Sequence, residues 1–594
     1  MDHPQTPTRA PSRRAGHPRT AATRRIALLA TATAALLAGC ASTSNPPPGV
    51  PPNSPPIGTA PLACAAMATI TVPAAAIGLP TRGARVTSAT VVAPGGTGAA
   101  ALGEYCKVLA DIAPVDPSAP AIKLELDLPT QWNRKLLMFG GGGYNGSIRP
   151  TPNSNVPAGP ANQPYPLGRG YATVTSDSGH QGGANAVQNG SFGVNDEAVR
   201  NFSSDALKKT RDVAVALLRQ RYAVAGPERA YFAGGSTGGR EALAVLQNWP
   251  ADWNGAIALY PAGAAASLDL QFGRIAQALA RPGAYPNAAK RKRLFDAALQ
   301  ACDELDGVKD GIIGNTRACQ ARFDPATAQV GGVPLRCANG AERGDACLSD
   351  AQIAALKVFD SPIRFDYPLG SGETGYPGFN LWGSDLGMDG TQPAQPTVVT
   401  LALGSEQPAS PMPAKAPFPA IFWDQWVRFF VTRDPGFNSL TLDPARPGRW
   451  QARISELATL QDVNKTDLSA FQARGGKLLM AHGTNDVLVS TRATEDYFQR
   501  VQKTMGADRV DTFVRYYEIP GYGHAVSTTF NAAWDSLTTL ENWVERGVAP
   551  PPQVVADTIG VPGRTRPLCA YPGYPRYNGS GDVNQAASFG CAQP

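Results

Sequence analysis

A serine, an aspartate and a histidine follow one another along the chain in an order that suits nucleophilic catalysis. Ser236 is the central residue of a Gly-x-Ser-x-Gly motif, and Asp486 and His524 follow it, 38 residues apart. In such a set the histidine removes the serine proton, the acid orients the histidine, and the serine forms an acyl-enzyme. These residue types therefore predict serine ester hydrolysis, with a serine peptidase as an alternative.

The serine motif lies between two segments of different secondary-structure preference. An apolar run of strand character, 230–233, precedes it, and a helix-forming segment, 240–246, follows it. Small neighbours are expected because a tight strand-to-helix turn leaves no room for larger side chains. The helix N-terminus would offer free N–H groups to an oxyanion beside Ser236. The motif alone also fits an ordinary glycine-rich turn, so the interpretation depends on the acid and the base.

Asp486 and His524 each come directly after a predicted strand. The strand at 476–481 leads into His482 and Asp486, and the strand at 512–519 leads into a glycine-rich turn before His524. This order of serine, acid and histidine is the order of α/β-hydrolases.

The other histidines fit the role of base less well. His3 and His17 lie in the predicted leader, and His180 precedes the nucleophile, where this topology does not place the base. His482 lies four residues from Asp486 at a strand end and is expected to be structural. His524 is therefore the predicted base.

A glycine run offers a second oxyanion donor. An apolar strand at 135–139 is followed by four glycines that end at Gly143. Glycines after a strand let backbone N–H groups approach a ligand closely, and in α/β-hydrolases this loop supplies an oxyanion donor. A flexible surface loop is the alternative.

The remaining pattern predicts an α/β fold, with an α/β-hydrolase core of mostly parallel sheet and helices on both faces. Further strands are expected at 121–128, 171–175 and 255–260, and helices at 203–220 and 532–546.

Two stretches, 62–261 and 466–594, are assigned to the catalytic domain. Between them, 262–465 changes to helices separated by long Gly/Pro-rich connections, which predicts a lid inserted over the active site. The helices of the lid are expected at 267–281, 287–302, 350–358 and 418–431.

The net charge of +6 comes mainly from the N-terminal end of the 594-residue chain. Six arginines and one aspartate in residues 1–39 leave 47 basic and 46 acidic residues in the remainder, which gives no indication of nucleic acid as a partner. The arginines and the apolar run 26–37 predict an export signal, because twelve apolar residues are too few to span a bilayer.

Cys40 follows small residues, as in the lipobox of bacterial lipoproteins, so residues 1–40 are predicted to be a lipoprotein-type signal that ends at an acylated cysteine. A Pro/Ser-rich tether, 41–61, would then hold the enzyme at the outer membrane. The alternative is a soluble periplasmic or secreted protein cut elsewhere. The sequence does not predict an oligomeric state.

With Cys40 set aside, eight cysteines remain, an even number that suggests four disulfides in an exported protein. Eight cysteines allow 105 pairings. Proximity favours Cys302–Cys319, Cys337–Cys347 and Cys569–Cys591, which leaves Cys64–Cys106.

An acidic run in the lid segment has the composition of a calcium site. Asp303, Asp306 and Asp310 are spaced three and four residues apart and are interleaved with glycines. Carboxylates in a tightly turning segment suit a hard cation such as Ca²⁺. A solvated acidic turn is the alternative. No organic cofactor is expected.

With these motifs assembled, the chain resembles the tannase and feruloyl esterase family over about residues 62–594. The motifs that carry the resemblance are Gly-Gly-Ser236-Thr-Gly-Gly-Arg-Glu, Cys302-Asp-x-x-Asp-Gly-x-x-Asp-Gly-Ile312, Ala481-His-Gly-x-x-Asp486, Pro520-Gly-x-x-His524 and Arg564-Thr-Arg-Pro-Leu-Cys569.

The resemblance implies an α/β-hydrolase core with a large lid, and esters of aromatic or phenolic acids as substrates. It implies a structural Ca²⁺ in the lid, and oxyanion donors in the backbone N–H groups of Gly143 and Thr237. The four disulfides favoured by proximity fit the family pattern. The Ca²⁺ ligands implied by the resemblance are the side chains of Asp303, Asp306 and Asp310 and the carbonyls of Val308 and Ile312.

The chain departs from the family at the two catalytic loops. Relatives usually carry cysteines directly before the serine and directly after the histidine, joined by a disulfide, whereas Gly235 and Ala525 stand here. A cross-link closing so long a loop would contribute about 4–5 kcal/mol in the chain-entropy model. Its loss predicts a triad that still works but is less rigidly aligned, with either lower activity or a roomier site.

Substrate-contacting residues in the lid are less defined. Arg428 and Arg433 are the nearest candidates for binding a substrate carboxylate, and Trp382, Trp423 and Trp426 could line an aromatic pocket or simply fill the lid core. A surface lipoprotein that binds a ligand without catalysis is a further alternative.

Overall fold

Ten strands form one sheet, and its second half positions the serine, acid and histidine. The computed structural model describes residues 60–389 and 397–594, so the predicted signal with Cys40 and most of the tether lie outside the described residues. In sheet order the strands are β1 (Thr71–Val72), β2 (Ala84–Val92), β3 (Tyr105–Ile112), β4 (Ile122–Pro129), β6 (Ala172–Ser176), β5 (Lys135–Phe139), β7 (Arg229–Gly235), β8 (Gly255–Leu259), β13 (Lys477–Gly483) and β14 (Val514–Ile519).

The sheet is parallel in one half and antiparallel in the other. The six strands from β6 to β14 pair in parallel, which accounts for five of the nine pairings. The strands β1 to β4 pair antiparallel, and β4 joins the parallel half through an antiparallel pairing with β6. The sequence predicts a mostly parallel sheet and indicates one strand, 121–128, of the antiparallel half. In the parallel half the carboxyl ends of the strands meet at one edge, where ligand sites of such sheets form.

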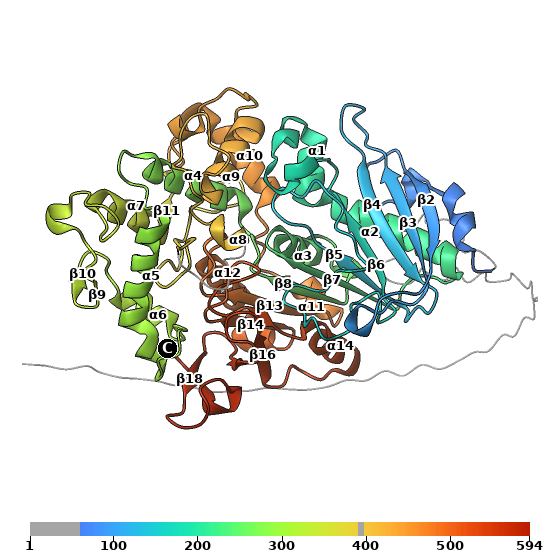
Figure 1. The fold of residues 1–594 in the computed structure, drawn as a ribbon. Coiled ribbons are helices and arrows are strands. Elements are labelled where there is room, and N and C mark those ends of the chain that lie inside the picture. The colour runs from blue at the N-terminus through green and yellow to red at the C-terminus, as the bar shows by residue number, and fades with distance from the viewer. Residues whose placement is uncertain (1–59, 390–396) are drawn as a thin grey trace, which may run out of the picture. The chain divides into compact units, whose positions relative to one another are not determined.

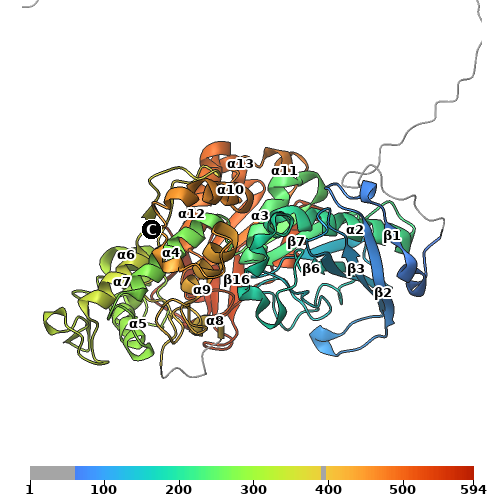
Figure 2. The ribbon, with the colours of Figure 1, turned by 90° about the horizontal axis from the view of Figure 1, so that it is seen from above.

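Helices cover both faces of the sheet (Figures 1 and 2). Alternate residues of β5 serve the two faces: Leu136 and Met138 pack in the core with α2 (Ala206–Tyr222), α3 (Thr237–Asn248) and α12 (Thr491–Met505). Leu137 and Phe139 belong to the opposite core with α14 (Ser536–Arg546). This alternation is the two-residue period of a strand that is buried on both faces.

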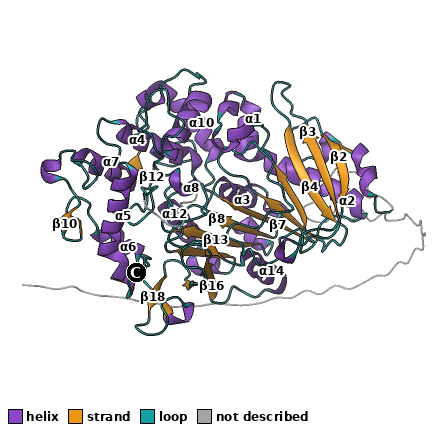
Figure 3. Cartoon of the chain, in the orientation of Figure 1, coloured by secondary structure: helices purple, strands orange, loops and turns teal. Residues whose placement is uncertain are grey.

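The segment between β8 and β13 is an insertion made mainly of helices, which separates clearly from the strand-rich half in Figure 3. Its buried residues form a core of their own that also takes in Tyr144, Phe192 and Phe202 from the sheet domain. The helices are α4 (Ala265–Ala280), α5 (Ala288–Cys302), α6 (Thr316–Arg322), α7 (Asp350–Asp360), α8 (Thr397–Thr400), α9 (Phe418–Gln425), which continues as a π-helical turn to Val431, and α10 (Gln451–Gln461).

Short elements complete the described chain. They are α1 (Asp196–Arg200), α11 (Ser469–Ala473), α13 (Ala507–Asp511), the small sheets β9 (Gln329–Val330) with β10 (Val333–Pro334) and β11 (Ile363–Arg364) with β12 (Gly375–Tyr376), and the C-terminal strands β15 (Ala532–Ala533), β16 (Gln553–Asp557), β17 (Thr565–Leu568), β18 (Tyr574–Tyr577) and β19 (Phe589–Ala592).

Four disulfides staple the described residues, and they are the pairs that proximity favoured. They join Cys64 to Cys106, Cys302 to Cys319, Cys337 to Cys347 and Cys569 to Cys591. Such a set is typical of proteins that fold in an oxidising compartment. Among the described helices, none has both the length and the apolar character needed to cross a membrane.

Candidate active site

Ser236 lies in a strained turn between β7 and α3. Its backbone has φ 60° and ψ −125°, a region that non-glycine residues rarely occupy. The turn is held because the Ser236 amide donates to the carbonyl of Leu259 on β8 (3.1 Å). A Cβ at Gly234 would lie 2.2 Å from the carbonyl oxygen of Gly238, so the motif glycine allows the strand and the helix to approach.

His524 and His482 share one carboxylate. The Nδ1 atom of His524 lies 2.8 Å from Oδ2 of Asp486, and Nε2 of His482 lies 3.2 Å from the same oxygen. The other oxygen of Asp486 accepts the backbone N–H groups of Leu488 (2.8 Å) and Val489 (2.9 Å). Asp486 is thus completely buried and fully hydrogen-bonded at the end of β13. The sequence predicts a structural His482 but does not reveal its contact with the acid.

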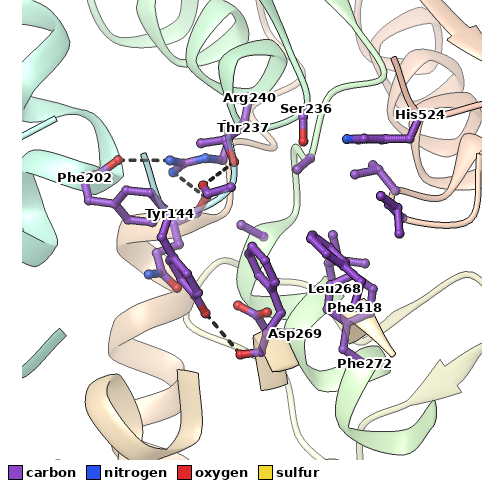
Figure 4. A pocket seen from close by; sticks show the side chains of 17 residues that line it. Tyr144, Phe202, Ser236, Thr237, Arg240, Leu268, Asp269, Phe272, Phe418 and His524 are labelled. Atoms are coloured by element: carbon purple, nitrogen blue, oxygen red, sulfur yellow. Dashed lines mark hydrogen bonds between the residues drawn. The ribbon is translucent and has the colours of Figure 1, made fainter. Parts of the chain in front are cut away.

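The electrostatic surroundings keep Asp486 ionised. Burial favours the neutral acid, but the charge of His524 and the hydrogen bonds from His482 and His524 outweigh it and hold the pKa of Asp486 below its usual value. An ionised carboxylate at Nδ1 leaves Nε2 of His524 free to act toward another group. In Figure 4 the His524 ring points toward the Ser236 hydroxyl.

The glycine loop after β5 reaches the N-terminus of α3. The hydroxyl of Thr237 donates to the carbonyl of Gly143 (2.7 Å), and the amide of Gly238 donates to the carbonyl of Gly141 (3.2 Å). Gly143 has φ +56°, and a Cβ there would lie 2.2 Å from the carbonyl oxygen of Val187, so only glycine fits. Among the described residues, the amides of Gly143 and Thr237 have no acceptor. Both therefore remain available to an oxyanion near Ser236.

Two cavities meet at Ser236 and His524. One is narrow and mostly apolar, and it extends between the glycine loop and α4 and α9 of the insertion (Figure 4). Besides His524, the residues that line it with a ring are Tyr144, Phe202, Phe272, Phe418 and Phe422. The other cavity is larger and more open, and it is lined by the whole glycine loop, Arg149, Asn155 and Tyr260. A substrate bound at Ser236 thus meets a narrower, mostly apolar pocket on one side and a wider, more open one on the other.

Besides Ser236, Thr237 and His524, three polar side chains interrupt the apolar lining of the narrow cavity, which we call the aromatic pocket. They belong to Arg240 on α3, Asp269 on α4 and Gln461 on α10. None of them is among the site residues predicted from the sequence. The sequence does contain a feature that could have pointed to Asp269, because this acid lies between Leu268 and Leu270 in an otherwise largely apolar helix.

The place of the missing clamp is occupied by a tyrosine. A Cβ at Gly235 would lie 2.4 Å from the ring of Tyr260, which therefore covers this glycine directly. On its other side the Tyr260 ring packs against His524, with ring centroids 4.8 Å apart. The hydroxyl of Tyr522 donates to the carbonyl of Ala525 (2.7 Å) and braces the second loop. The structure thus differs from the expectation of a roomier site at this position, because Tyr260 fills the space.

Several lid residues named from the sequence lie away from both cavities. Trp382, Trp423 and Trp426 are buried in the core of the insertion, where the indole N–H of Trp423 donates to the carbonyl of Ser439. Arg428 pairs with Asp424 (2.9 Å), and Arg433 pairs with Asp196. None of these five residues lines either cavity.

The acidic run folds into a tight turn after α5. Asp303 accepts the amide of Gly311 (3.1 Å), Asp306 accepts that of Gly314 (3.1 Å), and Asp310 pairs with Arg566 from β17. Within 60–389 and 397–594, no group of three or more His, Cys, Asp or Glu side chains is arranged to hold a metal ion. In the same part of the chain, Asp303 and the buried Asp306 have no ion-pair partner, so their oxygens retain the donor chemistry that suits Ca²⁺.

Fold and site together define a carboxylic ester hydrolase of the α/β-hydrolase class. A family model described as tannase and feruloyl esterase matches residues 106–592, and the chain belongs to this family. An uncharacterised esterase of Agrobacterium fabrum is 38% identical over 537 residues, covering 89% of this chain and 93% of the relative. The mono(2-hydroxyethyl) terephthalate hydrolase of Piscinibacter sakaiensis is 33% identical and covers 84% of this chain and 87% of the relative.

Solved structures show the same fold. The crystal structure of feruloyl esterase B from Aspergillus oryzae superposes with a TM-score of 0.68 at 24% identity, covering 86% of this chain and 97% of that one. At this low sequence identity the similarity shows that the fold is shared and nothing more.

Proposed function

We propose that the protein hydrolyses carboxylic esters of aromatic acids through an acyl-enzyme formed on Ser236. The main support is the contact of His524 Nδ1 with Asp486 Oδ2 at 2.8 Å beside Ser236. The same serine lies next to a cavity lined by the rings of one tyrosine and four phenylalanines. Relatives named feruloyl esterase and mono(2-hydroxyethyl) terephthalate hydrolase support the aromatic acyl group.

In this mechanism His524 takes the proton of Ser236 as the hydroxyl attacks the ester carbonyl. Asp486 keeps the histidine in the required tautomer and stabilises the imidazolium that forms. The amides of Gly143 and Thr237 stabilise the tetrahedral oxyanion. His524 then protonates the leaving alcohol, and water attacks the acyl-enzyme by the same route in reverse.

In this proposal each cavity binds a different part of the substrate. The aromatic pocket takes the acyl ring, because flat apolar walls suit a ring. The open cavity takes the leaving alcohol, because its polar lining and its width suit groups of varied size. Arg149 lies in the open cavity and would contact the alcohol portion.

Kinetics on aryl esters test the assignment. Ser236→Ala and His524→Ala should each lower kcat by a factor of at least about 10³, because the triad acts as a unit. Wild-type protein should release a burst of p-nitrophenol from p-nitrophenyl acetate, and Ser236→Ala should release none. Wild-type turnover retained in either variant would refute these catalytic roles.

We further propose a structural Ca²⁺ at the acidic run, held by the carboxylates of Asp303, Asp306 and Asp310 and the carbonyls of Val308 and Ile312. Asp303, Asp306 and Asp310 follow one another in one tight turn, and Arg566 pairs with Asp310. A bound cation would compensate the remaining buried negative charge. It lies in the insertion and takes no part in the chemistry.

We also propose export, with Cys40 as the lipid-anchored N-terminus at the outer membrane. The four disulfides support export. Metabolic labelling with a fatty acid would detect the anchor, and loss of the label in Cys40→Ser with continued secretion would assign it to this residue. Equal labelling of the two proteins would overturn the anchor.

A further inference from the structure

The aromatic pocket contains one carboxyl group with no partner inside the protein. Asp269 on α4 is 7% exposed and lines the pocket together with Ser236. Throughout the described ranges, 60–389 and 397–594, its oxygens make no hydrogen bond and no ion pair. Buried polar groups are almost always partnered, so an unpartnered one that faces a ligand cavity points to a partner on the ligand.

A neighbouring acid, Asp462, is by contrast hydrogen-bonded within the protein. Asp462 accepts the amide of Ala266 (2.8 Å) and the hydroxyls of Ser267 (3.1 Å) and Ser371 (2.7 Å). These bonds fix the start of α4. Asp269, one turn further along the helix, has none of them and holds no structural element in place.

The nearby guanidinium does not neutralise Asp269 by contact. Arg240 donates to the carbonyls of Phe202 (3.0 Å) and Ser203 (2.9 Å) and packs over the Phe202 ring. These bonds turn the guanidinium toward backbone carbonyls, and it forms no ion pair with Asp269. The carboxyl therefore faces the pocket without a cation in contact.

Burial and the charge of Asp462 raise the pKa of Asp269 well above its usual value. Burial therefore favours the neutral form of this carboxyl. A neutral carboxyl offers one O–H donor and one carbonyl acceptor. A phenolic hydroxyl on a substrate ring has the matching acceptor and donor.

We propose that Asp269 is a specificity-determining residue that hydrogen-bonds a ring hydroxyl on the acyl group of the aromatic ester. The proposal rests on the function proposed above and adds the substituent that the pocket selects. Figure 4 shows the geometry: Ser236 and His524 lie at one end of the pocket and Asp269 at the other, with aromatic rings between them. An acyl ring attacked at its carbonyl by Ser236 would extend its far edge toward Asp269. A ring carboxylate there would place another acid beside Asp269 and Asp462, so the pocket should disfavour it.

The test compares three esters that differ only at the ring position opposite the ester: methyl 4-hydroxybenzoate, methyl benzoate and monomethyl terephthalate. Wild-type kcat/KM should be highest for the hydroxyl compound, by roughly tenfold over methyl benzoate, as one net hydrogen bond provides. Monomethyl terephthalate should be the poorest. Asp269→Leu should reduce the hydroxyl preference to near one, while Asp269→Asn, which keeps a donor and an acceptor, should retain part of it.

Gln277→Leu is the matched control, because Gln277 is a polar residue of α4 that lines neither cavity. It should keep the wild-type order of the three esters. A hydroxyl preference that survives in Asp269→Leu, or a wild-type preference for monomethyl terephthalate, would overturn the proposal. Failure of the proposed function gives a different result, namely no Ser236-dependent release of p-nitrophenol from p-nitrophenyl acetate by the wild-type protein.

Discussion

The ring of Tyr260 packs against the ring of His524, with centroids 4.8 Å apart and planes inclined by 56°. The same tyrosine covers Gly235, the residue before Ser236. It therefore contacts both loops that relatives join with a disulfide. In this protein the packing of Tyr260 therefore takes the place of that disulfide.

Replacing Tyr260 should loosen His524. Tyr260→Ala removes a buried ring, which costs about 3 kcal/mol of folding stability, and should lower kcat more than it changes KM because the base is misaligned. Tyr260→Phe keeps the ring and should stay near wild type. Tyr222→Ala, which removes a ring that stacks on Trp132 far from the site, controls for stability loss alone. Equal kcat in Tyr260→Ala and wild type would show that the ring does not position the base.

Restoring the two cysteines alone should fail. A cysteine at Gly235 places Cβ 2.4 Å from the Tyr260 ring, so Gly235→Cys with Ala525→Cys should lower the melting temperature and leave free thiols. Adding Tyr260→Ala makes room, and the triple variant should form the disulfide and regain stability. Thiol titration and thermal melts measure both effects. A double variant that closes the disulfide and melts above wild type would contradict the steric argument.

His482 should tune the acid without touching substrate. Its loss in His482→Leu removes one of the groups that hold the pKa of Asp486 down, so that pKa should rise. Asp486 would then hold its charge and its bond to His524 less firmly, so kcat should fall by about tenfold. The kcat of His482→Gln, which keeps a donor for Asp486, should lie between those of the wild type and His482→Leu. A wild-type kcat in His482→Leu would mean that Asp486 depends on His524 alone.

Asp177 should make the fold less stable as pH rises. Burial outweighs its hydrogen bonds and raises the pKa of Asp177 to about 6, above its unfolded value of about 3.9. The folded state then binds the proton more tightly, so the free energy of unfolding falls between about pH 4 and pH 6. Asp177→Asn keeps the acceptor for the Lys123 and Gly179 amides and should remove this slope, with a gain of up to about 3 kcal/mol at pH 7. Denaturant titrations at pH 4 and pH 7 give the free energy of unfolding of the wild type and of Asp177→Asn. An equal change with pH in both proteins would refute the role of Asp177.

Calcium should stabilise the insertion. At a hundredfold excess over its Kd, Ca²⁺ should add about 2.7 kcal/mol, and EDTA should lower the melting temperature. Asp306→Asn should abolish the difference, while Asp296→Asn, which alters an acid of α5 that pairs with Lys292, should keep it. Melting curves that coincide with Ca²⁺ and with EDTA would exclude the site.

The sequence predicted the parts of the fold that obey local rules. The strands that end at Phe139, Gly235 and Gly483 were found because apolar runs end there in glycine or polar residues. Four helices of the insertion, α4, α5, α7 and α9, were predicted within a few residues because their apolar periodicity is regular, whereas α10 was not predicted. The antiparallel strands β1, β2 and β3 were not predicted; β2 is buried only at Ala84 and Val86, so most of its length shows little apolar alternation.

The contents of the pocket could not be derived in the same way. Tyr144, Phe272 and Phe422 come from three distant segments, and only the packing of the insertion against the sheet brings their rings together. The role of Tyr260 depends on contacts with Gly235 and His524 that no sequence spacing encodes. Motifs identify residues whose partners are local, whereas a pocket depends on long-range packing.

Each of the four disulfides closes a loop within the sheet domain or within the insertion, and two of them lie wholly inside the insertion. Across the boundary the contacts are non-covalent, such as the ion pairs of Arg492 with Asp360 and of Arg500 with Glu373. The insertion is therefore stiffened internally but joined to the sheet by reversible contacts. A reducing environment should therefore loosen each part internally and leave the contacts between the two parts in place.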